Sequence, residues 1–279
     1  MVDFHLHTRF SDGCLTPSEL VNRAYNSGVK AISITDHDTL NGLDDGYKSA
    51  NDLGLIFING IEISTMVEDI NDEIHIIGLN FNKSDRALID MCLELKENRF
   101  QRNTALINKL DSIGITIDKN ELLADKTICS IGKPDFAYYL YKKKIISCVY
   151  QAYDYYLKDD EGFCIKKKLI DYKKVIEIIR NAGGVAILAH PLQIDIPKEK
   201  LLELVNKLTL VGLNGIEIYY NGYKKKDIKY LKSIAKKYEL FISGGSDFHC
   251  DNMRNSIIGF YGKKKNIPFV LYDNLLKLY

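Results

Sequence analysis

The chain has 279 residues, of which 46% are hydrophobic and 27% are charged, an ordinary composition for a globular protein. Its formal net charge of +1 excludes a global electrostatic attraction to nucleic acid or to an anionic membrane. No apolar run approaches the roughly 20 residues that span a bilayer, and the first residues lack the basic and apolar regions of a signal peptide. We therefore expect a cytoplasmic protein without membrane association.

Seven short, mostly apolar segments recur along the chain and predict strands. Most of them are continuous apolar runs, which are typical of strands buried on both faces. They lie at residues 2–7, 31–36, 56–64, 74–81, 185–190, 215–220 and 240–247.

Helical patterns lie between many of these strands. Thr16 followed by Pro17 predicts a capped helix start, and Gly28 predicts the end of that helix. Similar patterns cover residues 172–181 and 224–238. Strands that alternate with helices indicate a parallel α/β architecture.

One region breaks this alternation. Residues 85–168 contain helical patterns, at 87–111 and 135–143, and no convincing strand. We therefore predict one barrel domain from residues 1–84 and 169–279, with 85–168 as a helical insertion that contacts the substrate. Tyrosines cluster in this insertion, at Tyr138, Tyr139, Tyr141, Tyr150, Tyr153, Tyr155 and Tyr156.

Histidines and carboxylates lie at or beside the predicted strands. In a barrel of parallel strands, the carboxyl ends of the strands and the loops after them form the active face, so separate residues converge there. A lone histidine in an apolar stretch is more often a hydrogen-bonded core residue, but none of the six histidines lies in the insertion. This segregation favours one metal site. The residues concerned are His5, His7, Asp12, His37, Glu62, His75, His190, Asp247 and His249.

The types of ligand narrow the choice of metal. Imidazoles with carboxylates suit Mn²⁺, Fe²⁺ or Zn²⁺ better than a soft Cu(I) site. Six histidines with Asp12, Glu62 and Asp247 exceed what one tetrahedral ion uses, so we expect two or three divalent ions with Glu62 as a bridge. Such centres suit hydrolysis, because they activate water and neutralise phosphate oxygens. Asp36 and Asp38 are expected to orient His37, and Asp36, His37 and Asp247 are the expected catalytic residues.

The motifs resemble those of the PHP (polymerase and histidinol phosphatase) family. Gly183-Gly184-x-Ala186-x-x-Ala189-His190-Pro191 and the insertion are similar to the branch that contains nucleoside 3′,5′-bisphosphate phosphatases and 5′-end-trimming ribonucleases. The motifs that carry the family resemblance are His5-x-His7 with Asp12-Gly13, Thr35-Asp36-His37-Asp38-Thr39, Gly60-Ile61-Glu62-Ile63-Ser64, Ala189-His190-Pro191 and Gly244-Gly245-Ser246-Asp247-Phe248-His249.

The resemblance implies a distorted barrel of seven strands with three metals at its carboxyl-terminal rim. It also implies how the nine ligands are divided among the metals. One metal takes His5, His7, Glu62 and Asp247; a second takes Asp12, His37 and His249; a third takes Glu62, His75 and His190.

The insertion is expected to supply substrate contacts. Arg99 and Arg102 are three residues apart on a predicted helix, so they share one face and can hold a second phosphate, as a similar pair does in relatives. The alternative is a surface pair with Glu94 or Glu97. Lys133 and Asp135 depart from the family pattern, in which arginine precedes the proline and histidine follows it. Lys133 keeps the charge without the bidentate fork, and Asp135 places an anion near the substrate.

The six cysteines form no C-x-x-C pair, which excludes a redox motif or a zinc ribbon of that kind. We expect reduced thiols. Cys14 and Cys250 flank ligand motifs, and we expect each to be a small residue at the rim without a catalytic role, the alternative being a sensor of oxidation or a metal ligand.

These features predict a metal-dependent phosphoesterase that acts on a small phosphorylated substrate, a nucleoside 3′,5′-bisphosphate or similar nucleotide, through a metal-activated hydroxide. The alternatives are a 5′–3′ exonuclease on short RNA and a histidinol-phosphate phosphatase. A non-catalytic metal-binding accessory protein is a more distant alternative. No obligate protein partner is indicated.

Overall fold

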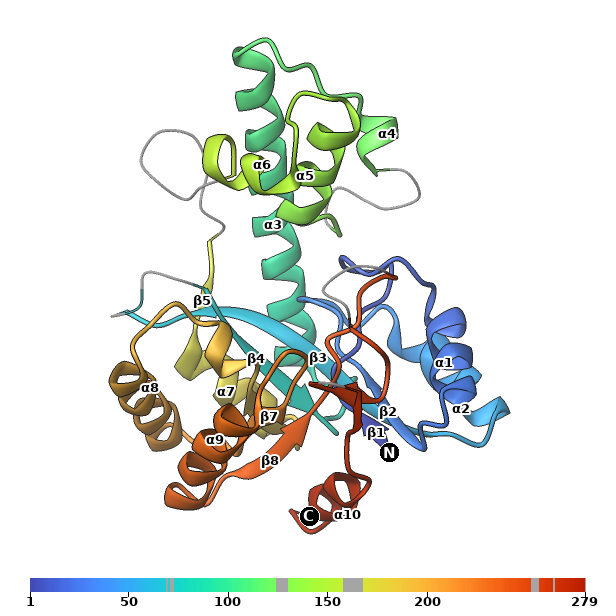
Figure 1. The fold of residues 1–279 in the computed structure, drawn as a ribbon, viewed down its shortest axis with the longest axis vertical. Helices are drawn as coiled ribbons and strands as arrows, with labels where there is room; N and C mark the ends of the chain where they lie inside the picture. Colours follow the sequence, from blue (N-terminus) through green and yellow to red (C-terminus); the bar gives the residue numbers. More distant parts are fainter. Residues whose placement is uncertain are drawn as a thin grey trace.

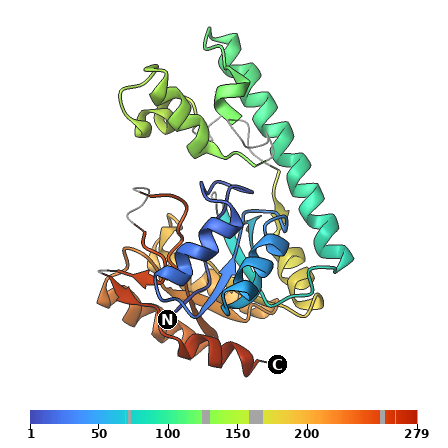
Figure 2. The ribbon, with the colours of Figure 1, turned by 90° about the vertical axis from the view of Figure 1, so that its right-hand side faces the viewer.

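The computed structural model describes residues 1–68, 70, 73–123, 130–157, 168–251, 256–262 and 264–278. A barrel of strands and helices forms one end of the molecule, and a long helix, α3 (Arg86–Ser112), rises from it toward three short helices (Figures 1 and 2). None of the described helices is both long enough and apolar enough to cross a membrane.

The main sheet contains all seven predicted strands, in the order β1-β2-β3-β4-β6-β7-β8, and a short additional strand, β5, pairs with β3. The separate pair β9 and β10 is antiparallel. The strands are β1 (Val2–Asp3), β2 (Ala31–Ile34), β3 (Ile56–Met66), β4 (Ile74–Leu79), β5 (Ile170–Asp171), β6 (Val185–Leu188), β7 (Gly215–Tyr219), β8 (Phe241–Gly244), β9 (Phe260–Tyr261) and β10 (Lys265–Asn266).

The direction of β4 corrects the prediction of an all-parallel sheet. β4 runs antiparallel to β3 and to β6, whereas the other pairs along the main sheet are parallel. The physical reason is the short connection between β3 and β4, with Thr65 opposite Ile74, because a hairpin joins antiparallel strands and a parallel return needs a crossover of a dozen or more residues. The start of β4 therefore lies at the carboxyl ends of its neighbours.

Several strands end earlier than predicted, at Asp3, Ile34, Leu188 and Gly244. The residues that follow leave the regular ladder for isolated bridges, such as the one between Leu6 and Phe248. They form the rim of the barrel, where the histidines and carboxylates lie.

Hydrogen bonds between the first and the last strand segments close the barrel. Phe4 N–H donates to the Gly244 carbonyl at 3.2 Å, and Asp247 N–H donates to the His5 carbonyl at 3.0 Å. Gly245 is required at this seam, because a Cβ there would lie 2.1 Å from the Cβ of His5. The resulting fold is a distorted α/β barrel.

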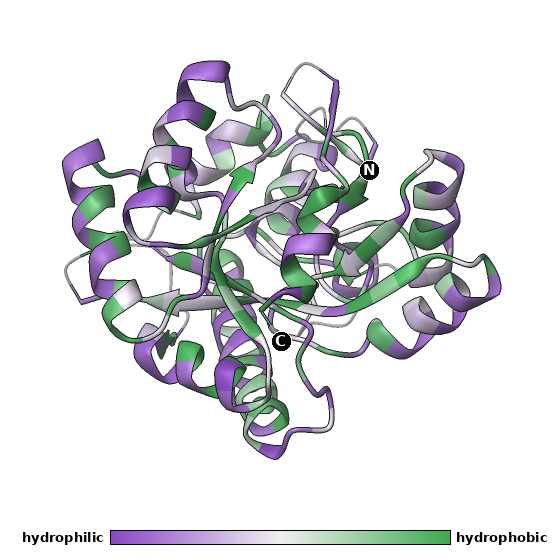
Figure 3. Cartoon of the chain, turned by 90° about the horizontal axis from the view of Figure 1, so that it is seen from below, coloured by the Kyte–Doolittle hydropathy of each residue, from purple (hydrophilic) through white to green (hydrophobic). Residues whose placement is uncertain are grey.

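Helices pack around the sheet with their apolar sides inward and their polar sides outward (Figure 3). The predicted cap of α1 is present, since Thr16 Oγ1 accepts the N–H of Glu19 and Pro17 begins the helix. The helices of the barrel are α1 (Pro17–Asn26), α2 (Leu43–Asp52), α7 (Tyr172–Asn181), α8 (Lys198–Leu210), α9 (Lys225–Lys237) and α10 (Val270–Leu276), with a 3₁₀ turn at Pro191–Gln193.

The insertion contains α3, α4 (Lys119–Leu123), α5 (Lys133–Lys142) and α6 (Val149–Tyr155), and its described residues form no strand. The first half of α3 buries Leu88 and Leu95 in the core of the barrel. Its second half packs Leu106 and Leu110 in a separate apolar cluster with α5 and α6. The second half of α3 and the short helices thus share a core of their own, while the division at residues 85–168 stays a prediction.

Candidate metal centre

Side chains from six strands of the barrel, or from the loops after them, meet at one place. His5 and His7 follow β1, His37 follows β2, Glu62 lies in β3 and His75 lies in β4. The loop after β1 contributes Asp12, the end of β6 leads to His190, and the end of β8 leads to Asp247 and His249. The structure therefore brings together all nine residues of the predicted ligand set.

Glu62 lies at the centre of this cluster and is fully buried. Its Oε2 is 3.1 Å from His5 Nε2, 3.2 Å from His7 Nε2 and 3.2 Å from His37 Nδ1. Its Oε1 is 3.0 Å from His75 Nδ1 and 2.8 Å from His190 Nε2. One carboxylate thus faces five histidines, three on one oxygen and two on the other.

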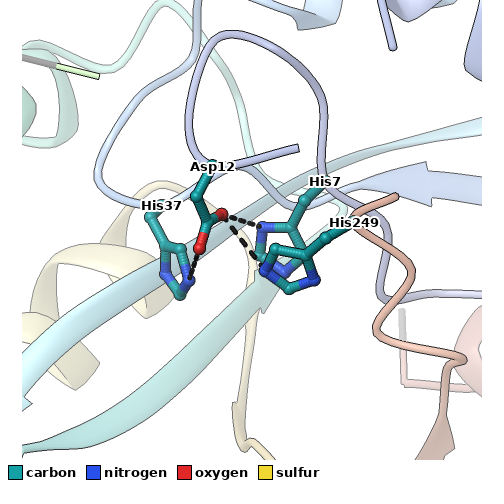
Figure 4. A group of neighbouring side chains, drawn as sticks. All are labelled: His7, Asp12, His37 and His249. Atoms are coloured by element: carbon teal, nitrogen blue, oxygen red, sulfur yellow. Dashed lines mark ion pairs between the residues drawn. The ribbon is translucent and has the colours of Figure 1, made fainter. Parts of the chain in front are cut away.

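Asp12 faces a second part of the cluster (Figure 4). Its carboxylate is 3.1 Å from His249 Nε2, 3.7 Å from His7 Nδ1 and 3.8 Å from His37 Nε2. Asp247 Oδ1 lies 3.4 Å from His5 Nε2 and 3.2 Å from His7 Nε2.

The donor atoms fit metal ions. Ligand atoms about 2.1 Å from one ion at tetrahedral angles are about 3.4 Å apart, which is close to the separations above. Many of these atoms are buried without a hydrogen-bond partner in the described structure, an arrangement that a metal ion resolves. They are His5 Nε2, His7 Nδ1 and Nε2, Asp12 Oδ1, His37 Nδ1, Glu62 Oε2, His190 Nδ1 and His249 Nε2.

Four groups of ligand atoms lie close enough to hold an ion. They differ in part from the division that the family resemblance implies, because His7 joins the group around Asp12 and His5 approaches both Glu62 and His190. The groups are His7, Asp12, His37 and His249; His5, His7 and Asp247; His5, Glu62 and His190; and His37, Glu62 and His75.

The ionisation of the cluster suits cation binding. Burial raises the pKa of Glu62, but the imidazoles of His5, His37 and His75 outweigh it and hold that pKa well below its usual range. Burial lowers the pKa of His37 to about 3, so this imidazole stays neutral. Burial also lowers the pKa of His7, but Asp247 and Glu62 outweigh it and raise the pKa to about 9 in the metal-free protein. An ion in place of that proton satisfies the same carboxylates.

Asp36 holds the loop that carries Asp12. Its carboxylate accepts hydrogen bonds from Thr8 N–H at 2.7 Å, Thr8 Oγ1 at 2.6 Å and Ser11 Oγ at 2.6 Å. Asp36 was predicted both to orient His37 and to be catalytic; the structure places its carboxylate against this loop.

Left-handed backbone conformations occur beside the ligands. Asp38 has φ 59°, His190 has φ 25° and Asp247 has φ 51°. Such conformations are unfavourable for residues other than glycine and cluster at functional sites, where the surrounding structure enforces them. All three of these residues lie at the rim of the barrel, beside or within the ligand cluster.

The residues that contact the ligands but were not predicted as site residues include Glu217, Tyr220 and Glu73, whose Oε1 lies 2.9 Å from His75 Nε2. Glu217 in β7 lies 3.0 Å from His5 Nδ1, and Tyr220 Oη donates to Asp247 Oδ2 at 2.7 Å. A signal for Glu217 was present: Gly215-Ile216-Glu217-Ile218 repeats the four residue types of 60–63, and it places a single charge inside a buried apolar strand.

The predicted substrate residues lie in different surroundings. Arg99 and Arg102 are both buried on α3, and Arg99 pairs with Asp38 at 2.5 Å, not with either glutamate of its own helix. Asp135 Oδ2 accepts the N–H of Gly132 at 2.8 Å, so it caps the start of α5, where Lys133 also lies.

Two clefts flank the cluster and share His37. The smaller one, of about 320 Å³, is lined by His75, His190 and Asp247. The larger one, of about 910 Å³, extends from His37 to α3, and its described lining includes Arg99 but neither Arg102, Lys133 nor Asp135. Three further cations line it, Arg9, Lys83 and Lys96, together with Asp38, Asp44 and Asp45, and Lys83 pairs with Asp44.

The expectation of reduced thiols is wrong for one pair. Cys14 and Cys250 form a disulfide, with their Cα atoms 5.4 Å apart. The two loops were far apart in sequence, but the closed barrel places them side by side, and Cys14 N–H donates to the His249 carbonyl at 3.0 Å. The disulfide therefore joins the loop of Asp12 to the loop of His249. Cys92 and Cys148 are free.

The chain is similar to known proteins in sequence and in fold. The PHP domain model matches residues 3–243. The chain is 35% identical to a 5′-3′ exoribonuclease of Haemophilus influenzae over 88% of this chain and 89% of that protein. It is 28% identical to a 3′,5′-nucleoside bisphosphate phosphatase of Chromobacterium violaceum, over 89% and 87% of the two chains. The solved structure of an amidohydrolase from C. violaceum with bound sulfate superposes with a TM-score of 0.86 at 25% identity, covering 99% of this chain and 96% of that one.

Proposed function

Because the chain belongs to the PHP domain family and is a metal-dependent phosphoric ester hydrolase, we propose that it hydrolyses a phosphomonoester on a small nucleotide that carries two phosphates. The observation that carries this proposal is the large cleft that begins at His37 and ends at α3, where Arg9 and Lys96 line it beside Arg99. A cleft that joins a metal centre to several cations suits a substrate with two separated anionic groups.

We propose that the nine clustered residues hold two or three divalent ions, of manganese, iron or zinc. When bound, these ions supply a nucleophilic hydroxide and neutralise phosphate oxygens. The protein holds the ligand side chains in fixed positions. Glu62 faces both sides of the cluster, while His37 and Asp247 border the clefts from which substrate approaches. Asp36 serves the reaction by holding the loop of Asp12.

The large cleft is proposed to hold the rest of the nucleotide. Arg99 borders this cleft, and Lys96, nearly one turn earlier on the same helix, borders it too. Since Arg99 shares its charge with Asp38, we propose that Lys96 and Arg9 contribute most of the attraction for the second phosphate. Arg102, Lys133 and Asp135 are proposed to support this wall of the cleft from the insertion.

The test is phosphate release from adenosine 3′,5′-bisphosphate by the Mn²⁺-loaded protein, compared with adenosine monophosphate. The bisphosphate should be hydrolysed with the higher kcat/KM, and the His5→Ala, His7→Ala double variant should be inactive. Lys96→Met should raise KM for the bisphosphate, whereas Lys229→Met, an exposed lysine on α9, should not. Equal kcat/KM for the two nucleotides, or no release above the double variant, would contradict the proposal.

A second candidate is 5′–3′ trimming of short RNA. It is favoured by the 35% identity to an exoribonuclease and by exposed tyrosines on the insertion, Tyr138, Tyr150 and Tyr155, since aromatic rings stack on bases. Turnover of 5′-phosphorylated RNA of three to five nucleotides, measured beside the bisphosphate and histidinol phosphate, separates the three substrates. A higher kcat/KM for RNA, lowered by Tyr150→Ala, would favour the exonuclease.

A further inference from the structure

Glu217 is a fully buried carboxylate outside the nine-residue ligand set. It lies in the middle of β7, and both of its oxygens are engaged by residues of that set. Oε1 lies 3.0 Å from His5 Nδ1, and Oε2 accepts the backbone N–H of His190 at 2.8 Å. A buried charge is costly unless it is paired and hydrogen-bonded, so these two contacts explain how the strand tolerates it.

The contact with His5 selects one form of its ring. A carboxylate accepts hydrogen bonds, so it holds the proton of a neutral imidazole on Nδ1 and leaves Nε2 unprotonated. That Nε2 faces Glu62 Oε2 at 3.1 Å and Asp247 Oδ1 at 3.4 Å. The unprotonated Nε2 and the carboxylate oxygens around it are all hydrogen-bond acceptors, and none of them supplies a proton. Such a group of acceptors is a suitable environment for a cation.

The contact with His190 fixes a backbone conformation. His190 has φ 25° and ψ 57°, which a non-glycine residue adopts only when its surroundings enforce it. The Glu217 carboxylate holds the N–H in this conformation, and the ring of His190 then stacks on His5 with 5.6 Å between centroids. His190 Nε2 reaches Glu62 Oε1 at 2.8 Å.

We propose that Glu217 is a positioning residue for the metal centre: it fixes the tautomer of His5 and the backbone of His190, and so sets metal occupancy on both sides of Glu62. The inference rests on the proposed metal ligands and is independent of the substrate. It predicts that the group of His7, Asp12, His37 and His249, which Glu217 does not contact, keeps its ion when Glu217 is changed.

Glu217→Gln is the sharpest variant, because it preserves size and removes one acceptor. If the amide oxygen faces His190 N–H, the amide NH₂ faces His5 and forces its proton onto Nε2. If the amide oxygen faces His5, the NH₂ meets the N–H of His190, donor against donor. Either arrangement disables one ligand. Ser243→Ala is the matched control, since Ser243 is buried opposite Glu217 on β8 and its hydroxyl has no hydrogen-bond partner among the described residues.

The experiment measures zinc bound per chain after the protein is stripped with a chelator and reloaded, and zinc affinity by chelator competition. Loss of a hydrogen-bond partner of a metal ligand typically weakens metal binding by about 10- to 100-fold. We expect Glu217→Gln to lose this much affinity at one or two positions and to retain one tight ion, while Ser243→Ala binds as the original protein does. Unchanged stoichiometry and affinity in Glu217→Gln would overturn the proposal.

A second measurement needs no change at Glu217. In the zinc-loaded original protein with ¹⁵N-labelled histidines, long-range ¹H–¹⁵N spectra report which ring nitrogen carries the proton, and His5→Ala identifies the signal. We expect a proton on His5 Nδ1; its absence there would refute the inference even if Glu217→Gln fails to fold. Neither measurement uses a substrate, so a failed phosphatase assay leaves this test intact.

Discussion

Replacing Arg99 by methionine is expected to lower the free energy of unfolding by about 3–5 kcal/mol, because it removes one partner of a buried ion pair. Arg99 is 7% exposed and Asp38 is 3% exposed, so solvent does little to screen the pair. Asp38 also accepts the N–H of Ser64 at 2.9 Å in a left-handed conformation, so its carboxylate cannot turn toward solvent without losing that bond.

The assay is urea unfolding of the metal-free protein followed by circular dichroism. With a slope of about 3 kcal/mol per molar urea, the midpoint should fall by about 1 to 1.7 M. Arg86→Met is the matched control on the same helix. Arg86 pairs with Asp90, but these side chains are 85% and 51% exposed, and such surface pairs contribute about 0.3–0.5 kcal/mol.

A double-mutant cycle tests the cause of the loss. If loss of this ion pair is responsible, Asp38→Asn in the Arg99→Met background should recover at least about 1 kcal/mol relative to the sum of the single changes. Additive effects, or an Arg99→Met shift no larger than that of Arg86→Met, would refute the reasoning. The same pair joins α3 to the loop of His37, so its loss should also weaken the attachment of the insertion to the metal face.

Three further predictions follow from single contacts. Cys250→Ser removes the link to Cys14 and should lower stability under oxidising conditions by about 2–4 kcal/mol in chemical denaturation; an equal loss in Cys148→Ser would contradict this. Burial raises the pKa of the Cys92 thiol to about 12. The rate of its alkylation by iodoacetamide, measured by peptide mass spectrometry, should therefore rise about tenfold per pH unit from pH 7 to pH 10. A plateau of this rate near pH 9 would be inconsistent with that pKa. Tyr220→Phe removes the hydrogen bond to Asp247 and should weaken zinc binding about tenfold in chelator competition. An unchanged zinc affinity would show that this bond does not hold the carboxylate in place.

The sequence predicts most of the ligand cluster because histidine is rare in this chain and segregates to the strands. His75 was included in the predicted ligand set, but the prediction of parallel strands did not explain how it reaches the other ligands. It begins its strand, and in an all-parallel barrel it would lie at the opposite end from His5. The antiparallel direction of β4 brings it to the metal face, and strand direction depends on the length and path of connections that a pattern of apolar residues does not encode.

The partners of charged residues were harder to predict. The pair of Arg99 with Asp38 joins two segments 61 residues apart, whereas spacing along the helix indicated a contact with a second phosphate or, alternatively, with Glu94 or Glu97. In the sequence, Glu217 is only a charged residue within a strand, whereas closure of the barrel places it against His5. The disulfide between Cys14 and Cys250 depends on the same closure. Each of these contacts depends on tertiary structure, which the periodicity of helices and strands does not predict.

The closure of the barrel also has a consequence for protein synthesis. Glu217 emerges from the ribosome 212 residues after His5, which corresponds to about 10 to 40 s of translation. Asp247 and His249 emerge later still. During this interval the first strand lacks its final neighbour, and His5 and His7 have only part of their ligand set. We therefore expect capture of a complete metal centre to follow the docking of the final strand of the barrel on its first.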